Sequence, residues 1–308
     1  MATTTSITTT YAGEFAGKYI SSALLSANTI DKGGIEVMPN IKYKSTMKKV
    51  ATDANVIKNA SCDFDATATV TLTERLLQPE EFQVNLQFCK QDFQSDWEAV
   101  QMGISAFDNL PPKFSDFIIG HVAGLVAEKT EKNIWEGVNA NAGEFDGLVT
   151  LALADTDVID APNHAAVTAA NVVEKLGEIV DSIPAALYGK EDVHIYISQN
   201  IARAYVRALG GFAATNSGVN AQSHMWYGDG ALSFDGVKLF VANGLNDDTA
   251  MAAQRSNLYF GTGLLNDMNE VKVLDMADLD GSQNVRVVMR YTSAVNYGIG
   301  SDVVLYHA

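Results

Sequence analysis

The stretch FSDFIIGHVAGLVAEKTEKNIWEG, Phe114 to Gly137, carries the longest helical period of the chain. Its apolar residues recur at steps of three and four, which predicts one amphipathic helix. The polar side would include Glu128, Lys129, Glu131 and Lys132. Pro111 and Pro112 stop the preceding segment, and Gly137 is placed to end the helix in a left-handed conformation. At about 1.5 Å per residue the helix spans more than 30 Å, so we expect a spine that braces the subunit.

Composition excludes several classes of protein. The 308 residues are 47% hydrophobic and 19% charged, which is ordinary for a globular chain. The formal charge of −16 argues against a protein that binds a nucleic-acid duplex by neutralising phosphates. No apolar run is long enough to span a membrane, and the Thr-rich start lacks the features of a secretion signal. We therefore expect a protein that works in a cytoplasm or in something assembled there.

The segment before the predicted spine changes to a period of two. Residues 13–28 predict a short helix, after which apolar side chains alternate with polar ones from Gly33 to Gln78. The alternation is clearest over residues 66–73 and predicts a long β-hairpin. Because an isolated two-stranded ribbon is marginal in water, this hairpin needs a surface on which to rest.

This hairpin is basic, whereas the rest of the chain is acidic. Between Lys32 and Lys58 there are six lysines and two acids, a local charge of +4. One interpretation is a solvated edge that lysines protect from aggregation. The other is a hairpin that reaches onto the acidic body of an identical neighbour, where opposite potentials favour docking. The second interpretation makes Lys42, Lys44, Lys48 and Lys49 candidate contacts between subunits.

The second half of the chain predicts an α/β section followed by strands. No basic residue occurs between Lys132 and Lys175, and we place a domain boundary near residues 139–147. Helices are expected around residues 172–183 and 199–209, with a strand at Val193 to Ile197 between them. A long loop is expected over residues 212–230, and Asp235-Gly236 predicts a tight hairpin turn. Further strands are expected at residues 257–261, 271–274, 285–291 and 303–306.

The sequence contains fragments of cofactor-binding and metal-binding motifs, but none of these motifs is complete. Gly261-Thr262-Gly263 lacks the third glycine and the following helix of a dinucleotide fingerprint. The segment around Asp278 and Asp280 lacks the first ligand and the closing Glu of a calcium loop. The five histidines are dispersed without paired spacing. The sequence therefore predicts no catalytic, cofactor-binding or metal site, and no enzyme.

The order of these parts resembles the Hong Kong 97 fold of tailed-bacteriophage major capsid proteins, over nearly the full chain. The residues that carry the resemblance are SNLYFGTG (Ser256 to Gly263), VRVVMRYTSAVNYG (Val285 to Gly298) and the final VVLY. The N-terminal GEFAGKYISSALLSANTIDKGGIEVMPNIKYK also looks like capsid subunits of phages that infect Bacteroidetes.

This resemblance implies an α+β fold with five parts. They are an N-terminal arm (1–32), an extended β-hairpin loop (33–78), a peripheral domain (79–146) with the spine helix 114–137, an axial domain (147–253), and closing strands (254–308) that return from the peripheral to the axial domain. It also implies a structural subunit that self-assembles into hexamers and pentamers of an icosahedral head around double-stranded DNA.

The implied partners are the chain itself, then portal, scaffolding and head-decoration proteins, with weak non-specific contact to packaged DNA, no membrane and no cofactor. The implied location is the virion capsid, assembled in the host bacterial cytoplasm. Two alternatives stay open at this point. One is an encapsulin-like nanocompartment shell of the same fold, and the other is a soluble α/β enzyme.

Overall fold

The computed structural model describes residues 28–52, 57, 59, 70–89, 112–209, 232–263, 272–277 and 281–308. The helices are α1 (Asn28–Asp31), α2 (Pro112–Glu136), α3 (Leu148–Ala154), α4 (Val172–Asp181) and α5 (Gln199–Ala208). The strands are β1 (Glu36–Met38), β2 (Ser45–Thr52), β3 (Val70–Leu77), β4 (Glu80–Cys89), β5 (Ile159–Asp160), β6 (Val193–Ile197), β7 (Ser233–Phe234), β8 (Val237–Val241), β9 (Ala250–Gln254), β10 (Leu258–Thr262), β11 (Lys272–Asp275), β12 (Asn284–Tyr297) and β13 (Val304–Tyr306). The fold is a mixture of helices and sheets, as the sequence predicts.

Some expected features lie outside the described residues. These are the arm before Asn28 with most of its helix, residues 66–69 of the hairpin, the loop over residues 212–230, and Asp278 to Asp280. Within the described part, no helix is long and apolar enough to cross a membrane.

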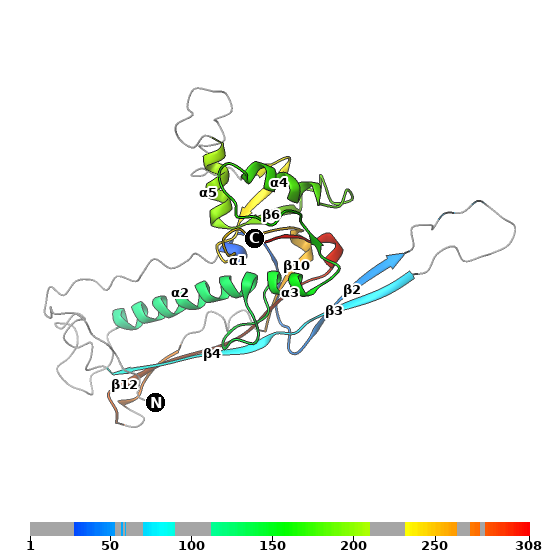
Figure 1. Cartoon of the computed structure of the whole chain (residues 1–308). Coiled ribbons are helices and arrows are strands. Elements are labelled where there is room, and N and C mark those ends of the chain that lie inside the picture. Colours follow the sequence, from blue (N-terminus) through cyan, green and yellow to red (C-terminus); the bar gives the residue numbers. More distant parts are fainter. Residues whose placement is uncertain are drawn as a thin grey trace.

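One sheet is built around β12, the longest strand. Along one edge β12 pairs antiparallel with β4, from Asn284 opposite Cys89 to Ser293 opposite Glu80. Its other edge pairs first with β11 and then with β10. Val285, Val287 and Met289 are buried while Arg286 and Arg290 are exposed, so the strand has the period of two that the sequence predicts. Figure 1 shows α2 running alongside the β4–β12 strands.

A second sheet has the strand order β5-β13-β9-β6-β8-β7. Alternate residues of β6 serve two cores: Ile195 and Ile197 pack with α4 and α5, and Tyr196 packs on the other side. The strand reads VHIYI because both of its faces are covered. The expected turn at Asp235-Gly236 joins β7 to β8, and both residues have positive φ, 46° and 79°.

The core on the Tyr196 side joins the two sheets. It contains Trp135 from α2, Leu148 from α3, Tyr196 and Met251 from the second sheet, and Phe260 from the first. The Trp135 and Tyr196 rings lie 5.0 Å apart, and Trp135 is fully buried. The carboxyl end of α2 is therefore an anchor in a core shared by both sheets.

The predicted spine is confirmed as a helix, with two corrections at its carboxyl end. Gly137 does not have a positive φ. A Cβ there would lie 2.2 Å from the carbonyl oxygen of Phe145, so the position requires glycine for close packing. Glu131, expected on the polar side, is 1% exposed because α1 and the loop after β8 cover this end of the helix.

The predicted hairpin over Gly33 to Gln78 is wrong at its start. Residues 36–38 form β1, which pairs in parallel with β10 and so belongs to the first sheet. The hairpin itself is β2 paired with β3, from Ser45 opposite Leu77 to Thr52 opposite Val70. Period-two alternation marks a strand but does not say which strand it will pair with.

Candidate functional site: the projecting ribbon

The β2–β3 hairpin, called here the ribbon, is the part of the described chain that extends furthest from the body (Figure 1). Its register places directly opposed residues on the same face. Among the residues whose side chains are described, the inner face holds Ser45, Met47, Lys49, Thr71, Arg75 and Leu77. The outer face holds Thr46, Lys48, Val50, Val70, Leu72, Glu74 and Leu76.

The inner face is tied to the body at its base. The Arg75 guanidinium forms an ion pair with Asp155, at the end of α3, and its Cζ lies 4.6 Å from the centre of the Tyr297 ring. The Tyr297 hydroxyl donates to Asp155 Oδ2 at 2.8 Å. Leu77 is 1% exposed and packs with Ile41 and Ala294. The ribbon therefore leaves the body in a direction set by an aromatic and ionic joint.

The carboxylate of this joint is held ionised. Burial acts to raise the pKa of Asp155, but hydrogen bonds from the Asp157 amide, Arg75 and Tyr297 outweigh it, so the pKa lies below its usual value. Burial and the neighbouring Asp155 carboxylate raise the pKa of the Tyr297 hydroxyl. Both shifts keep Asp155 charged and Tyr297 protonated at neutral pH, the states that this contact requires.

The outer face presents an apolar strip to solvent. Val50 and Leu72 oppose each other and are 63% and 61% exposed, and Val70 is 65% exposed. Leu76 is 48% exposed nearer the base. Lys48 and Glu74 form an opposed pair of unlike charges within this strip. Contiguous exposed apolar side chains on one face are typical of a surface that becomes covered by a partner.

The four candidate lysines do not share one surface. Lys42 and Lys44 are exposed in the segment before β2, where Lys44 Nζ lies 5.2 Å from the Tyr43 ring centre. Lys48 is on the outer face. Lys49 is on the inner face, where its Nζ contacts Ser301 Oγ at 3.4 Å.

The lysines are evident from the sequence, whereas the apolar strip of the outer face was not predicted from it. The signal that could have found it is the spacing of Val70, Leu72 and Leu76 at even positions of one strand, opposite Val50 of the other.

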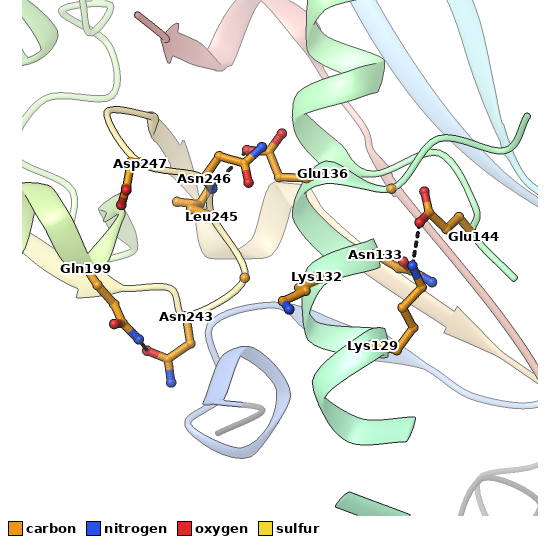
Figure 2. A pocket seen from close by; sticks show the side chains of 12 residues that line it. Lys129, Lys132, Asn133, Glu136, Glu144, Gln199, Asn243, Leu245, Asn246 and Asp247 are labelled. Atoms are coloured by element: carbon orange, nitrogen blue, oxygen red, sulfur yellow. Dashed lines mark hydrogen bonds and ion pairs between the residues drawn. The ribbon is translucent and has the colours of Figure 1, made fainter. Parts of the chain in front are cut away.

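A cleft of about 490 Å³ lies where the carboxyl end of α2 meets the loop after β8 (Figure 2). Lys129 forms an ion pair with Glu144, Lys132 forms one with Glu128, and Glu136 accepts a hydrogen bond from the Asn246 amide at 3.2 Å. The hydrogen bond from Lys129, with others from Asn141 and Val138, lowers the pKa of Glu144 to about 2. Because these charged groups already have partners, and Glu136 joins α2 to the loop after β8 through Asn246, we interpret the cleft as a joint between α2 and the second sheet.

Beneath this cleft, Glu131 connects three elements. Its carboxylate accepts hydrogen bonds from the Thr29 amide at 3.1 Å and from the Thr29 hydroxyl at 2.5 Å. The Trp135 indole donates to the same Thr29 hydroxyl at 2.9 Å. Burial raises the pKa of Glu131, although the hydrogen bonds from Thr29 act in the opposite direction. A Cβ at Gly244 would lie 2.1 Å from the Glu131 carbonyl, so the loop after β8 also packs directly on this point.

Comparison of the fold with solved structures gives matches over almost the whole chain. A chain from the capsid of a native GTA particle is 12% identical, with 95% of this chain and 94% of that chain covered and a TM-score of 0.62. The capsid of Myoviridae phage XM1 matches at 11% identity, with 94% of each chain covered and a TM-score of 0.60. A chain from Mycobacterium phage Adephagia matches at 14% identity, covering 93% and 91%, also with a TM-score of 0.60.

Comparison at the level of sequence gives no match, either to a protein-family model or to a curated protein. The likeness is therefore one of fold, carried by the order and pairing of the elements from α1 to β13. The chain has the fold of tailed-phage capsid subunits.

Proposed function

We propose that the chain is a major capsid protein, the structural subunit of an icosahedral phage head. In this proposal it assembles into hexamers and pentamers that enclose double-stranded DNA, and it acts as a building block rather than an enzyme. The observation that carries the proposal is the ribbon, whose inner face is tied to its own body while its outer face exposes an apolar strip. The capsid fold over nearly the full chain supports it.

The outer face of the ribbon is unfavourable in the isolated chain because its apolar side chains contact water. Val50, Val70 and Leu72 remain about six-tenths exposed, so most of the free energy that their burial would contribute is not gained in the single chain. Each would contribute on the order of 1–2 kcal/mol when covered. A second copy is the occupant we propose, because a shell repeats the same ribbon around each of its axes and gives every outer face an equivalent partner.

The charges of the ribbon and of the segment before it fit the same proposal. Lys42, Lys44 and Lys48 are exposed, and we propose that they meet acidic groups of the neighbouring copy. The segment from Asn133 to Glu174 has no Lys or Arg and exposes Asp157 and Glu174. Opposite potentials would steer the ribbon into place and set its register. Lys49 would instead support the ribbon through Ser301.

The proposed role of each region follows the five-part division that the resemblance to capsid proteins implies. The first sheet with α2 would form the peripheral domain, and the second sheet with α4 and α5 the axial domain around which five or six copies gather. Scaffolding, portal and decoration proteins are further proposed partners. An acidic subunit suits a container that must not adhere tightly to the DNA threaded into it.

Electron microscopy of the purified full chain in negative stain tests the proposal. Closed shells of uniform size are expected, whereas a compact monomer in solution would refute it. The matched variant replaces residues 48–74 by Asn-Gly, which leaves Met47 and Arg75 joined by a two-residue turn. This variant should fold, as judged by circular dichroism, and remain unassembled. Co-purification of one defined protein cargo would indicate a nanocompartment of the same fold instead of a phage head.

A further inference from the structure

The fold brings together three side chains that are dispersed in the sequence: Asp160, His164 and His307. Asp160 ends β5, which pairs in parallel with β13 so that Leu305 lies opposite Asp160. His307 directly follows β13, and His164 lies in the segment that folds back after β5. One ligand atom from each of the three side chains lies within 4.8 Å of the others.

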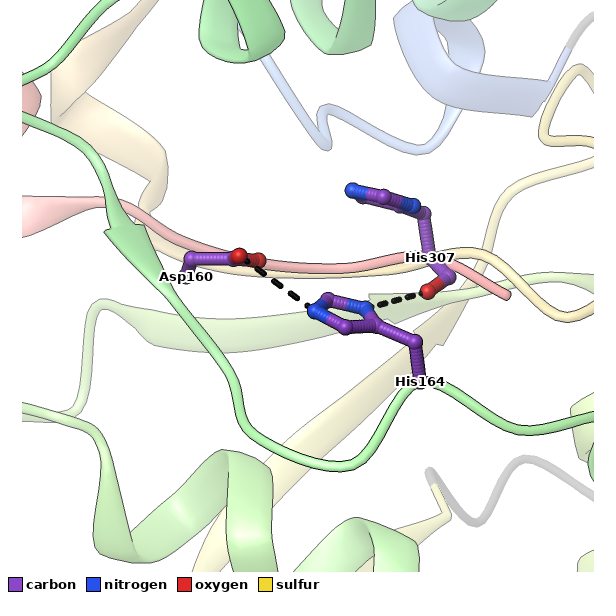
Figure 3. Close-up of side chains that lie close together, drawn as sticks. All are labelled: Asp160, His164 and His307. Atoms are coloured by element: carbon purple, nitrogen blue, oxygen red, sulfur yellow. Dashed lines mark hydrogen bonds and ion pairs between the residues drawn. The ribbon is translucent and has the colours of Figure 1, made fainter.

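The segment that carries His164 is held in place by its own contacts. The Ala161 amide donates to the Leu305 carbonyl at 2.8 Å, which continues the pairing beyond β5. The Tyr306 hydroxyl donates to the Ala165 carbonyl at 2.5 Å, and the Val167 amide donates to Asp248 at 2.9 Å. The imidazole of His164 is thereby placed between Asp160 and the end of the chain, as Figure 3 shows.

The hydrogen bonds of His164 determine which nitrogen is available. Its Nδ1 lies 2.6 Å from the carbonyl oxygen of His307, and a carbonyl can only accept, so Nδ1 carries the proton. Its Nε2 lies 3.3 Å from Asp160 Oδ2. In the neutral imidazole this contact places the Nε2 lone pair against a carboxylate oxygen, and a cation between the two atoms would be held by both.

The third group favours the cation. The His307 ring stacks on the His164 ring with centroids 4.6 Å apart, so it offers a further nitrogen beside the same carboxylate. Two imidazoles and one carboxylate are a donor set that suits Zn²⁺. The bond from Nδ1–H to a backbone carbonyl is the outer contact that zinc-bound histidines commonly make.

The distances allow a metal centre. With metal–ligand bonds of about 2.0–2.1 Å, tetrahedral ligand atoms lie roughly 3.3 Å apart, which is the present separation of Asp160 and His164. His307 needs only to approach by turning its partly exposed ring. We propose that Asp160, His164 and His307 bind one Zn²⁺, with water in the fourth position. The ion would fasten the end of β13 to the segment after β5.

Calorimetric titration of the full chain with Zn²⁺, after treatment with a chelator, tests this site. One saturable Zn²⁺ per chain is expected, together with a higher unfolding midpoint in its presence. His164→Ala, His307→Ala and Asp160→Asn should each weaken binding by more than the roughly 10- to 100-fold that loss of an outer contact costs. The visible absorption of bound Co²⁺ should show tetrahedral ligation in the unaltered chain and lose it in these variants.

His194→Ala is the matched control. The His194 ring also makes an Nδ1 contact with a backbone carbonyl, that of Asp192 at 3.0 Å, but it is outside the cluster. This variant should bind Zn²⁺ as the unaltered chain does. Absence of saturable binding, unchanged affinity in the three cluster variants, or an equal loss in His194→Ala would each overturn the assignment. Circular dichroism of every variant separates loss of the site from loss of the fold.

Discussion

The exposed strip of the ribbon allows a sharp test of assembly. The perturbation is the double variant Val50→Asp with Leu72→Asp, which replaces an opposed apolar pair on the outer face by two carboxylates. Both side chains are more than 60% exposed in the single chain, so their loss leaves its core intact. The folded subunit should therefore keep its stability, whereas the contact between subunits should weaken.

The magnitude follows from the area that docking would cover. Full burial of a Val or Leu side chain contributes about 1.5–3 kcal/mol, and about six-tenths of each remains to be covered here. The pair is then worth on the order of 2–4 kcal/mol per contact, or roughly 30- to 700-fold in its equilibrium constant. Burying two carboxylates would add to this loss.

The control compares two single variants, Thr71→Asp on the inner face and Leu72→Asp on the outer face. Each introduces one carboxylate, at adjacent and exposed positions of the same strand, so the effect of an added charge on the ribbon itself is closely matched. The assay is the protein concentration at which shells form, measured by light scattering with microscopy. We expect a large rise for the outer variants and a small one for Thr71→Asp. Equal effects would refute the assignment of the outer face as the contact.

Four further predictions concern the joints and the charges. Glu131→Ala leaves two buried donors of Thr29 without an acceptor and should lower the free energy of unfolding by about 2–6 kcal/mol. Its control, Glu128→Ala, removes a helical i,i+4 ion pair and should lower the free energy of unfolding by about 0.5 kcal/mol or less. Urea denaturation measures both changes. Arg75→Ala should make the ribbon more sensitive to limited proteolysis without unfolding the body, because it removes the contact with Asp155; equal sensitivity would contradict the anchoring role. Because the pKa of Glu144 is lowered from 4.5 to about 2, its stabilising contribution is complete above about pH 4.5 and lost as the pH falls through 2, so Glu144→Gln should flatten the dependence of stability on pH in that window. Changing Lys42, Lys44 and Lys48 to Glu should impair assembly more at low salt than at high salt, and an effect independent of salt would indicate a solvated edge instead.

Local patterns predicted most of the elements correctly. The spine, the strand Val193–Ile197, the turn at Asp235-Gly236 and the strands of the last third are all present within one to a few residues of their expected bounds. The main extension is β12, which continues to Tyr297 because β10 pairs with its second half. These elements could be predicted because their signals, the helix and strand periods and the turn residues, each lie within a few consecutive positions of the sequence.

The pairing of strands could not be predicted in the same way. Glu36–Met38 has the same alternation as a hairpin strand, but it pairs with β10, more than two hundred residues further along the chain. In the sequence Glu131 cannot be distinguished from Glu128, which is partly exposed, but Thr29 hydrogen-bonds to Glu131 and buries it. In both cases the deciding partner is remote, and no local pattern names it.

The candidate surfaces show the same division. The acidic body, the basic hairpin region and the elements of a capsid fold could be predicted from the sequence, because charge and periodicity are properties of the residues in order. The folded chain was needed to show that Val50 and Leu72 share an exposed face, that Arg75 fixes the ribbon to Asp155 and Tyr297, and that Asp160, His164 and His307 meet. Strand register and chain folding set these juxtapositions, and both depend on contacts between residues far apart in the chain.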